Sequence, residues 1–286
     1  MSPIALGVTD PAIKSLARST KPLTPLEAMG HAGKPVATIP RFASFAEERR
    51  WTLEHLAGAF RIFGREGYAE GIAGHISVRD PEFSDRLWIN PLGVHFSMMK
   101  VSGLICLDMR GNIVDGNRSV PANAAGVSIH TACHLARPDA HAICHAHSLY
   151  GKAWASFGRE LDMISQDVCY FYKAHSVYRN YGGIAFGQDE GTNIARALGD
   201  SKAAILVNHG LITVGETVDE AAYLYTLLEK SCRIQLMVEA TGLPKVIVPD
   251  DEAMSTFQSA SQPETLFVEF QPSYMLEEHL NPDFKH

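Results

Sequence analysis

Three histidines occupy positions from which their imidazoles could converge on a metal ion. His145 and His147 are two residues apart in residues 140–148, which read as a β-strand, and strand side chains two apart point to the same face. His209 follows the apolar run of residues 203–207, where a turn begins. Three imidazoles bind a metal at about 2.0–2.1 Å and leave a position open for substrate. Such a site would serve chemistry rather than structure.

The same spacing allows a plainer interpretation. A histidine at the end of a strand is often a hydrogen-bonded core or surface residue, and His-X-His pairs are only moderately specific for metals. The chain contains 13 His, so some close pairs are expected by chance. On spacing alone, both interpretations stay open.

Composition excludes several classes of protein. Of the 286 residues, 46% are hydrophobic and 20% are charged, which is typical of a soluble globular protein with a sizeable core. A formal net charge of −7 and the absence of long Lys or Arg runs argue against a nucleic-acid partner. No stretch approaches the ~20 apolar residues of a membrane span, and no secretory leader is visible. We therefore expect a cytoplasmic protein without a membrane partner.

The cysteines point to the same compartment. They are odd in number, scattered, and mostly embedded in apolar runs, which argues against a disulfide framework and favours buried thiols in a reducing environment. The five positions are Cys106, Cys133, Cys144, Cys169 and Cys232.

Three parts can be distinguished along the chain. Residues 1–44 mix Pro, Gly, Thr and Lys without periodicity and are predicted to form an arm that contacts another subunit. Residues 45–243 should form the main domain, and residues 244–286 a C-terminal tail that packs on a neighbour or folds back.

The expected helices of the domain begin near Phe45 and span residues 123–135, 189–198 and 218–239. Strands are expected at residues 71–79, 86–90, 103–108, 112–114, 140–148 and 203–207, in a mostly antiparallel sheet within an α/β fold.

Five segments of the chain, in this order, resemble the class II aldolase/adducin family over residues 48–242. They are residues 74–79 (Gly-His-Ile-Ser-Val-Arg), 90–93 (Asn-Pro-Leu-Gly), 129–139, 144–148 (Cys-His-Ala-His-Ser) and 208–210 (Asn-His-Gly). The resemblance implies a three-layer α/β/α fold with a mostly antiparallel central sheet. It also implies that His145, His147 and His209 bind a divalent metal, usually Zn²⁺ with Mn²⁺ or Fe²⁺ as alternatives. Members form homotetramers whose sites lie at subunit interfaces, so a neighbouring subunit could supply part of the site.

Departures from the family pattern bear on the reaction. The sugar-phosphate aldolases carry a Glu four residues before the helix histidine, as fourth ligand and general base, and here that position is Gly126. Their phosphate-binding Asn is replaced by His75, and Leu92, Ala124 and Ala125 stand where hydroxyl side chains are expected. A sugar phosphate is therefore a poor fit as the substrate.

The leading functional hypothesis is a metal-dependent carbon–carbon lyase, working in the aldol or retro-aldol direction on a small oxo acid such as pyruvate. A metal bound to the carbonyl and carboxylate oxygens would stabilise the enolate, and chelation would replace phosphate as the anchor. Secondary metabolism is one setting that we consider. The reaction needs a base, and each candidate could equally have a structural role: His75, His130, Asp167, Tyr170 and Tyr172.

Two other classes stay open. A decarboxylase or a non-haem iron oxygenase of an aromatic or oxo acid would fit the absence of a Glu at Gly126, because decarboxylation removes no carbon-bound proton, and a three-His face can hold Fe²⁺. An adducin-like binding module without catalysis is disfavoured, because adducin's head domain lacks the metal histidines that this chain retains.

Overall fold

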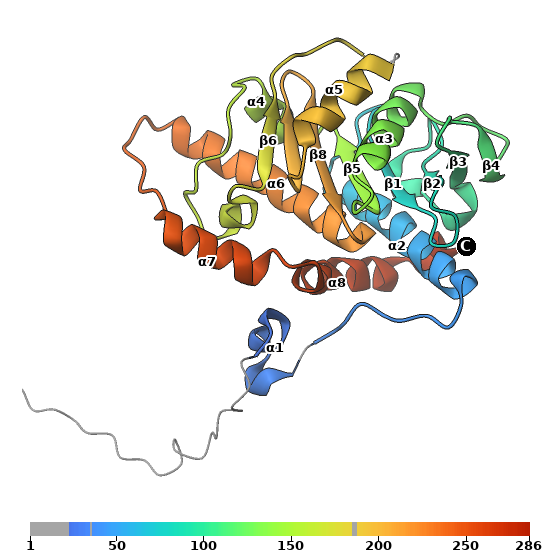
Figure 1. Ribbon diagram of the computed structural model, residues 1–286, viewed down its shortest axis with the longest axis horizontal. Coiled ribbons are helices and arrows are strands. Elements are labelled where there is room, and N and C mark those ends of the chain that lie inside the picture. The colour runs from blue at the N-terminus through green and yellow to red at the C-terminus, as the bar shows by residue number, and fades with distance from the viewer. Residues whose placement is uncertain (1–22, 35, 185–187) are drawn as a thin grey trace, which may run out of the picture. The chain divides into compact units, whose positions relative to one another are not determined.

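The computed structural model describes residues 23–34, 36–184 and 188–286, and it divides into two compact units, residues 1–36 and 37–286 (Figure 1). The described part of the first unit holds the short helix α1 (Pro25–Met29) and a 3-10 turn. Thr24 and Glu27 form a capping box at the start of α1. Most of the arm predicted for residues 1–44 lies outside the described residues.

The second unit is built around one sheet of eight strands. Neighbouring strands are antiparallel throughout, except for the parallel pair β6 and β7. The prediction of a mostly antiparallel sheet is therefore confirmed. Across the sheet the strands lie in the order β4 (Ile113–Gly116), β3 (Ile105–Asp108), β2 (Arg86–Ile89), β1 (His75–Arg79), β5 (Ala142–Ala146), β8 (Gly210–Gly215), β7 (Ala203–Leu206) and β6 (His175–Tyr178).

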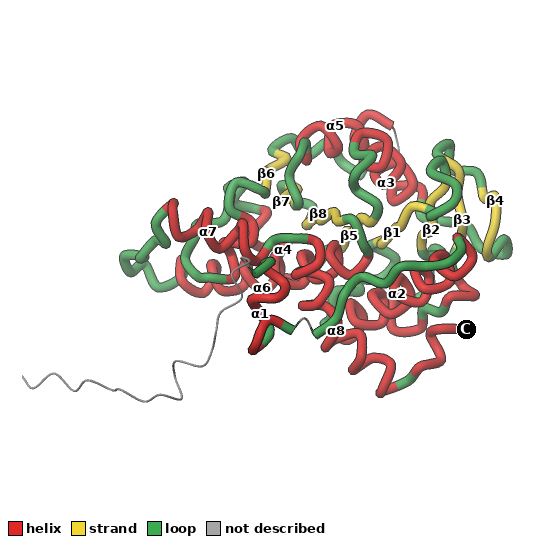
Figure 2. The backbone as a smooth tube through the Cα atoms, turned by 60° about the horizontal axis from the view of Figure 1, so that its bottom comes forward, coloured by secondary structure: helices red, strands yellow, loops and turns green. Residues whose placement is uncertain are grey.

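Helices cover both faces of the sheet, which confirms the three-layer α/β/α prediction (Figures 1 and 2). On one face lie α3 (Ala124–Ala136) and α5 (Gln188–Leu198), which pack against each other and, with β5, β7 and β8, enclose an apolar cluster. On the other face a larger cluster is enclosed by α2 (Phe45–Arg65), α4 (Leu149–Ala155) and α6 (Val218–Glu239). Because both faces are covered, strands such as β5, β7 and β8 are buried along their whole length.

Local sequence sets where the helices begin and end. The Ser44 hydroxyl accepts a hydrogen bond from the Glu47 amide at the start of α2, and the Thr217 hydroxyl does the same for Glu220 at the start of α6. Asn123 caps α3, which ends at the residue before Arg137 and Pro138. The predicted helices thus form within one or two residues of their expected bounds.

The C-terminal residues fold onto the same unit. Helices α7 (Asp250–Ala260) and α8 (Pro263–Leu280) are followed by a 3-10 turn at Pro282–Lys285. Phe270, Tyr274 and Phe284 are buried in the larger apolar cluster, where α8 packs against α2 and α6. Among the described residues, no helix combines the length and apolar character needed to cross a bilayer.

Candidate metal centre

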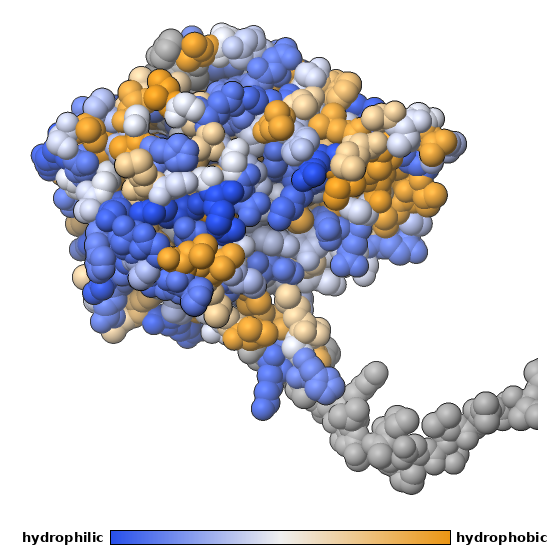
Figure 3. Space-filling view, turned by 180° about the vertical axis from the view of Figure 1, so that it is seen from behind, coloured by the Kyte–Doolittle hydropathy of each residue, from blue (hydrophilic) through white to orange (hydrophobic). Residues whose placement is uncertain are grey.

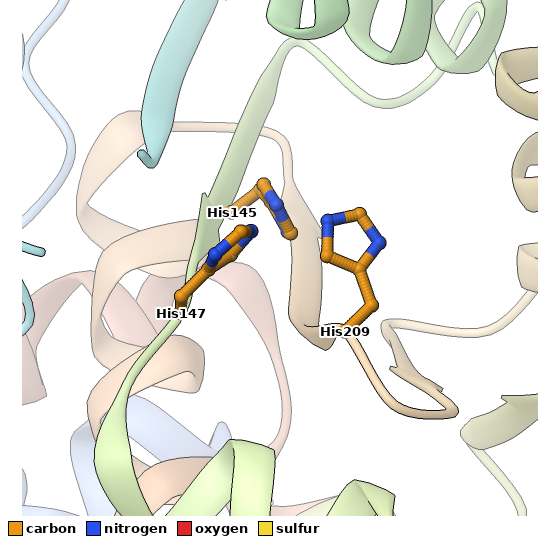
Figure 4. A group of neighbouring side chains, drawn as sticks. All are labelled: His145, His147 and His209. Atoms are coloured by element: carbon orange, nitrogen blue, oxygen red, sulfur yellow. The ribbon is translucent and has the colours of Figure 1, made fainter. Parts of the chain in front are cut away.

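The three histidines singled out by spacing lie together in the structure (Figure 4). His145 is on β5, His147 is the first residue after that strand, and His209 lies in the turn between β7 and β8. One ring nitrogen from each lies within 4.8 Å of the others, and the ring centroids are 4.8 to 5.1 Å apart. The strand ends one residue before His147, yet the ring still faces the other two.

The turn that carries His209 depends on two backbone features. Asn208 adopts a left-handed conformation with φ of 57°, which Asn tolerates better than most residues. Next to His209, a Cβ on Gly210 would come within 2.6 Å of the Ala146 carbonyl oxygen. Glycine therefore lets the start of β8 approach the end of β5, and this brings His209 close to His147.

Hydrogen bonds and burial prepare these imidazoles to bind a cation. Nδ1 of His145 donates to the Leu211 carbonyl oxygen at 2.9 Å, so Nε2 of the neutral ring carries a lone pair, and that atom is buried without a partner. Nδ1 of His209 is likewise buried and unpartnered. These orphaned nitrogens fit a metal ligand set.

The charge state of the cluster also suits ligation. Burial lowers the pKa of His145 well below its usual value and that of His209 to about 4, and it lowers the pKa of His147 as well. The neighbouring imidazoles add to the shift of His145 and His209, because two positive rings would repel each other. All three rings are therefore neutral near pH 7, as metal ligands must be.

His75 and Gly126 share one space beside the cluster. The His75 ring stacks against His145, with centroids 5.2 Å apart and an angle of 27° between the rings. A Cβ on Gly126 would lie only 2.6 to 2.9 Å from three atoms of the His75 ring. The two departures from the family pattern are thus linked by sterics, since no side chain fits at position 126 while His75 holds this rotamer.

His130 belongs to a buried network rather than to the wall of the cavity. Nδ1 of His134 donates to the Ala140 carbonyl oxygen at 3.1 Å, so its neutral Nε2 accepts from the Ser77 hydroxyl at 2.8 Å. The Ser77 oxygen then accepts from Nδ1 of His130 at 2.6 Å. Nε2 of His130 is left unprotonated, buried and unpartnered, on a ring 5.2 Å from that of His75.

The other three candidate bases lie elsewhere in the same chain. Asp167 and Tyr170 are part of the 3-10 helix η5 (Asp167–Phe171), which packs against α7, and Tyr172 follows it. The Tyr170 hydroxyl donates to Glu269 at 3.4 Å, and burial raises its pKa to about 12. None of the three lines the cavity beside the histidines, so a second copy of the chain would have to bring them there.

The cavity beside the histidines has a volume of about 580 Å³. Lys152 is its one basic side chain other than histidine among the described lining residues, and it is paired with Glu70. Sequence reasoning missed Ile72, Tyr181 and Ile184 of the outer wall, because they come from loops without a spacing signal. The apolar lining includes Ile72, Leu92, Ala124, Ala125, Ile129, Tyr181 and Ile184.

The fold and the site together define the class of protein. The sequence profile of the class II aldolase and adducin N-terminal domain matches residues 54–236, so the chain belongs to this family. Among solved structures, the L-fuculose 1-phosphate aldolase from Glaciozyma antarctica superposes with a TM-score of 0.80 at 38% identity, covering 87% of this chain and 96% of that one.

Two curated relatives carry other activities in their names. The 4-hydroxy-3-prenylphenylpyruvate oxygenase/4-hydroxy-3-prenylbenzoate synthase of Streptomyces roseochromogenus is 40% identical over 85% of this chain and 88% of its own length. The decarboxylase NovR of Streptomyces niveus is 42% identical over 73% of this chain and 77% of its own. Enzymes of different reaction types thus share this family.

Proposed function

We propose that this protein is a metal-dependent enzyme that breaks a carbon–carbon bond of a 2-oxo acid through an enolate. The observation that carries the proposal is the convergence of three neutral imidazoles, with the buried Nε2 of His145 left without a partner. A divalent metal held by His145, His147 and His209, Zn²⁺ first and Mn²⁺ or Fe²⁺ as alternatives, would act as a Lewis acid toward the oxygens of the oxo acid.

The cavity wall supports a substrate without phosphate. Lys152 is neutralised by Glu70, and Leu92, Ala124 and Ala125 offer no hydroxyl to a phosphate oxygen. Ile72, Tyr181 and Ile184 line the cavity and are 64%, 50% and 65% exposed, so they could cover an apolar or aromatic arm of the substrate. We therefore propose a 2-oxo acid anchored by its carboxylate and carbonyl groups, with its remaining part against these side chains.

In the retro-aldol reaction, His75 is the side chain best placed to move a proton. It would accept the proton of the hydroxyl group at C4, the C3–C4 bond would break with its electrons remaining on C3, and an aldehyde would leave. The same imidazolium could then return the proton to C3. His75 is the proposed base because it lines the cavity in the space that any side chain at position 126 would need.

A decarboxylase, or an iron-dependent oxygenase of an aromatic or oxo acid, is the second candidate. Loss of CO₂ from C3 leaves the same enolate and needs no base for a substrate hydroxyl, which suits a site with glycine at position 126. The names of the two Streptomyces relatives favour this candidate.

We also propose that the chain works as a homotetramer. Figure 3 shows apolar side chains gathered over the end of residues 37–286 at which α6 connects to α7. The exposed residues there are Met237, Leu243, Val246 and Ile247. An exposed apolar patch of this kind often marks a subunit contact. The cytoplasmic location and the division at residues 44 and 243 stay predictions.

Exchange of the pyruvate methyl protons tests the enolate directly. In D₂O, under argon, the zinc-loaded or manganese-loaded enzyme should replace methyl hydrogen by deuterium, as followed by proton NMR, and oxalate should compete as an enolate mimic. The His75→Gln variant should exchange at least about 100-fold more slowly, the usual worth of a general base. Failure to exchange, together with oxygen consumption by the iron-loaded enzyme, would favour the oxygenase.

A further inference from the structure

The chain on both sides of His147 is held by helix α6. The Tyr225 hydroxyl donates to the carbonyl oxygen of Ala146, the residue before His147, at 2.8 Å. It also lies 2.9 Å from the hydroxyl of Ser148, the residue after His147. That Ser148 hydroxyl donates to a carboxylate oxygen of Glu229 at 2.5 Å. One turn of α6 therefore fixes both neighbours of a proposed metal ligand.

Glu229 also fixes the start of the helix that follows His147. Its two carboxylate oxygens accept hydrogen bonds from the amides of Tyr150 at 2.8 Å and Gly151 at 2.6 Å, in the first turn of α4. A Cβ on Gly151 would lie 2.9 Å from Glu229 Oε2, so glycine gives the carboxylate its place. The point at which strand β5 gives way to helix α4 is thus set by one side chain.

The His147 ring has no anchor of its own. His145 is oriented by its hydrogen bond to the Leu211 carbonyl oxygen, whereas the His147 ring makes no protein hydrogen bond within the described structure. Metal-binding histidines usually have their second nitrogen held in this way. The place of the His147 ring therefore depends on its backbone, which α6 holds on both sides, and on edge contacts with the His145 and His209 rings.

Burying Glu229 without a cation is costly. The residue is 4% exposed, and within the described chain no Lys, Arg or His forms an ion pair with it. Its hydroxyl and amide donors offset part of the desolvation, but an apolar side chain of similar size would avoid that cost. A role in placing the neighbouring residues accounts for a carboxylate at this position.

We propose that Tyr225 and Glu229 are positioning residues that set the place of the His147 imidazole in the metal site. The inference rests on the proposed function only in requiring that the three histidines hold a metal. Loss of either side chain should leave the ligands present but misplace one of them, which weakens metal binding more than it weakens the fold.

The experiment measures zinc affinity of the full-length chain by competition with a chromophoric chelator, and the visible absorption of the Co²⁺-loaded chain. The variants are Glu229→Gln, which turns one acceptor into a donor, and Tyr225→Phe, which removes only a hydroxyl. Glu220→Gln is the matched control, because Glu220 is a buried carboxylate of the same helix that contacts Lys202 and the Glu216 amide instead.

Zinc affinity should fall roughly 10- to 100-fold in Glu229→Gln and in the same direction in Tyr225→Phe, the range found when second partners of metal ligands are lost. The Co²⁺ absorption should change in both, while Glu220→Gln should match the wild type. If Glu229→Gln fails to fold, Tyr225→Phe decides. Wild-type affinity in the folded variants, or an equal loss in Glu220→Gln, would overturn the proposal.

The same data separate this inference from the proposed function. A wild-type chain that binds neither zinc nor cobalt would remove the metal site and the positioning role together. A wild-type chain that binds metal but exchanges no pyruvate protons would count against the proposed reaction alone, and the affinities of the variants would still decide the role of α6.

Discussion

At the scale of single residues, the chemistry of the cavity depends on the contact between His75 and Gly126. The sequence shows both residues but not their contact, because one lies on β1 and the other on α3. The proximity of His145 and His147, in contrast, could be predicted from spacing, since a strand places residues two apart on one face, whereas His209 was added by its position after an apolar run and by the family resemblance. His130 could not be separated from a cavity residue by sequence, because its hydrogen-bond partner Ser77 lies on β1, far away along the chain.

The contact between His75 and Gly126 predicts that Gly126→Ala destabilises the wild-type protein but stabilises a protein that lacks the His75 ring. A double-mutant cycle tests this change of sign. In the wild-type background, Gly126→Ala should lower the free energy of unfolding by about 1–3 kcal/mol, because the new methyl group overlaps the His75 ring. In a His75→Ala background the same change should raise it by about 0.5–1 kcal/mol, the usual gain for replacing a helical glycine. Urea unfolding of the four proteins measures both values. If Gly126→Ala has the same effect in both backgrounds, the His75 ring moves aside freely and the expectation is wrong.

At the scale of elements, the pairing of α3 with β1 makes the fold sensitive to acid. His130 and His134 are buried, and burial lowers the pKa of each to about 3, whereas an unfolded histidine has a pKa near 6.5. The folded pKa is the lower one, so the unfolded chain binds more protons between these values. Stability is fully present above about pH 6.5 and falls with decreasing pH by about 1.4 kcal/mol per pH unit for each histidine.

Urea unfolding at several pH values between 7 and 5 checks this expectation. The His134→Gln variant keeps a side chain that can hydrogen-bond but cannot titrate. It should therefore take up about one proton fewer on unfolding, and its stability should depend less steeply on pH. An identical slope in the variant and the wild type would mean that His134 binds its proton as readily in the folded protein as in the unfolded chain.

A buried hydrogen bond between a histidine and an aspartate joins α2 to α6, next to α8. Nδ1 of His55 lies 2.8 and 3.0 Å from the two oxygens of Asp219, which is fully buried and also accepts from Gln271 at 2.8 Å. The His55 ring stacks on Tyr274 at 4.0 Å. Replacing His55 by Ala would leave the Asp219 carboxylate with one neutral donor from another helix, so we expect a loss of about 3–5 kcal/mol.

An exposed ion pair on α2, the helix that carries His55, serves as the control for His55→Ala. Arg50 pairs with Glu54 one turn away and its side chain is 81% exposed, so Arg50→Ala should change stability by about 0.5 kcal/mol or less. Thermal and urea unfolding of both variants give the comparison. Similar small effects in the two would show that α8 docks without help from this pair.

At the scale of the whole molecule, periodicity predicted the helices and most strands of the three layers. It did not predict every strand of the sheet or the packing of the C-terminal helices. Helices α2, α3 and α6 and most of the antiparallel strands follow from apolar spacing, caps and turns, but β8, which pairs with β5 and β7, was not expected. The parallel pairing of β6 with β7 was missed, because the short segment that forms β6 was not among the expected strands, although a helix such as α5 between two strands is the usual connection of a parallel pair. Nor could the packing of α8 against α2, since burial of Phe270 and Tyr274 depends on contacts distant in sequence.

Association of several copies of the chain would bear on which side chains complete the cavity. Tyr170 and Tyr172 belong to a different part of the chain, and the outer wall of the cavity is formed by exposed side chains such as Tyr181 and Ile184. In a homotetramer these surfaces would be available to a neighbouring subunit. The proposed tetramer would thus allow the remaining predicted bases to approach the metal site of another copy.

The most direct test of the central claim is the metal content of the chain purified without chelators, measured by elemental analysis beside the His209→Ala variant. His209 lies in a turn and is only partly buried, so the variant should remain folded by circular dichroism. We predict about one divalent metal per wild-type chain, as for other three-histidine sites, and a large loss of metal from the variant. A wild-type chain without metal, or a folded His209→Ala variant with full metal content, would contradict the account.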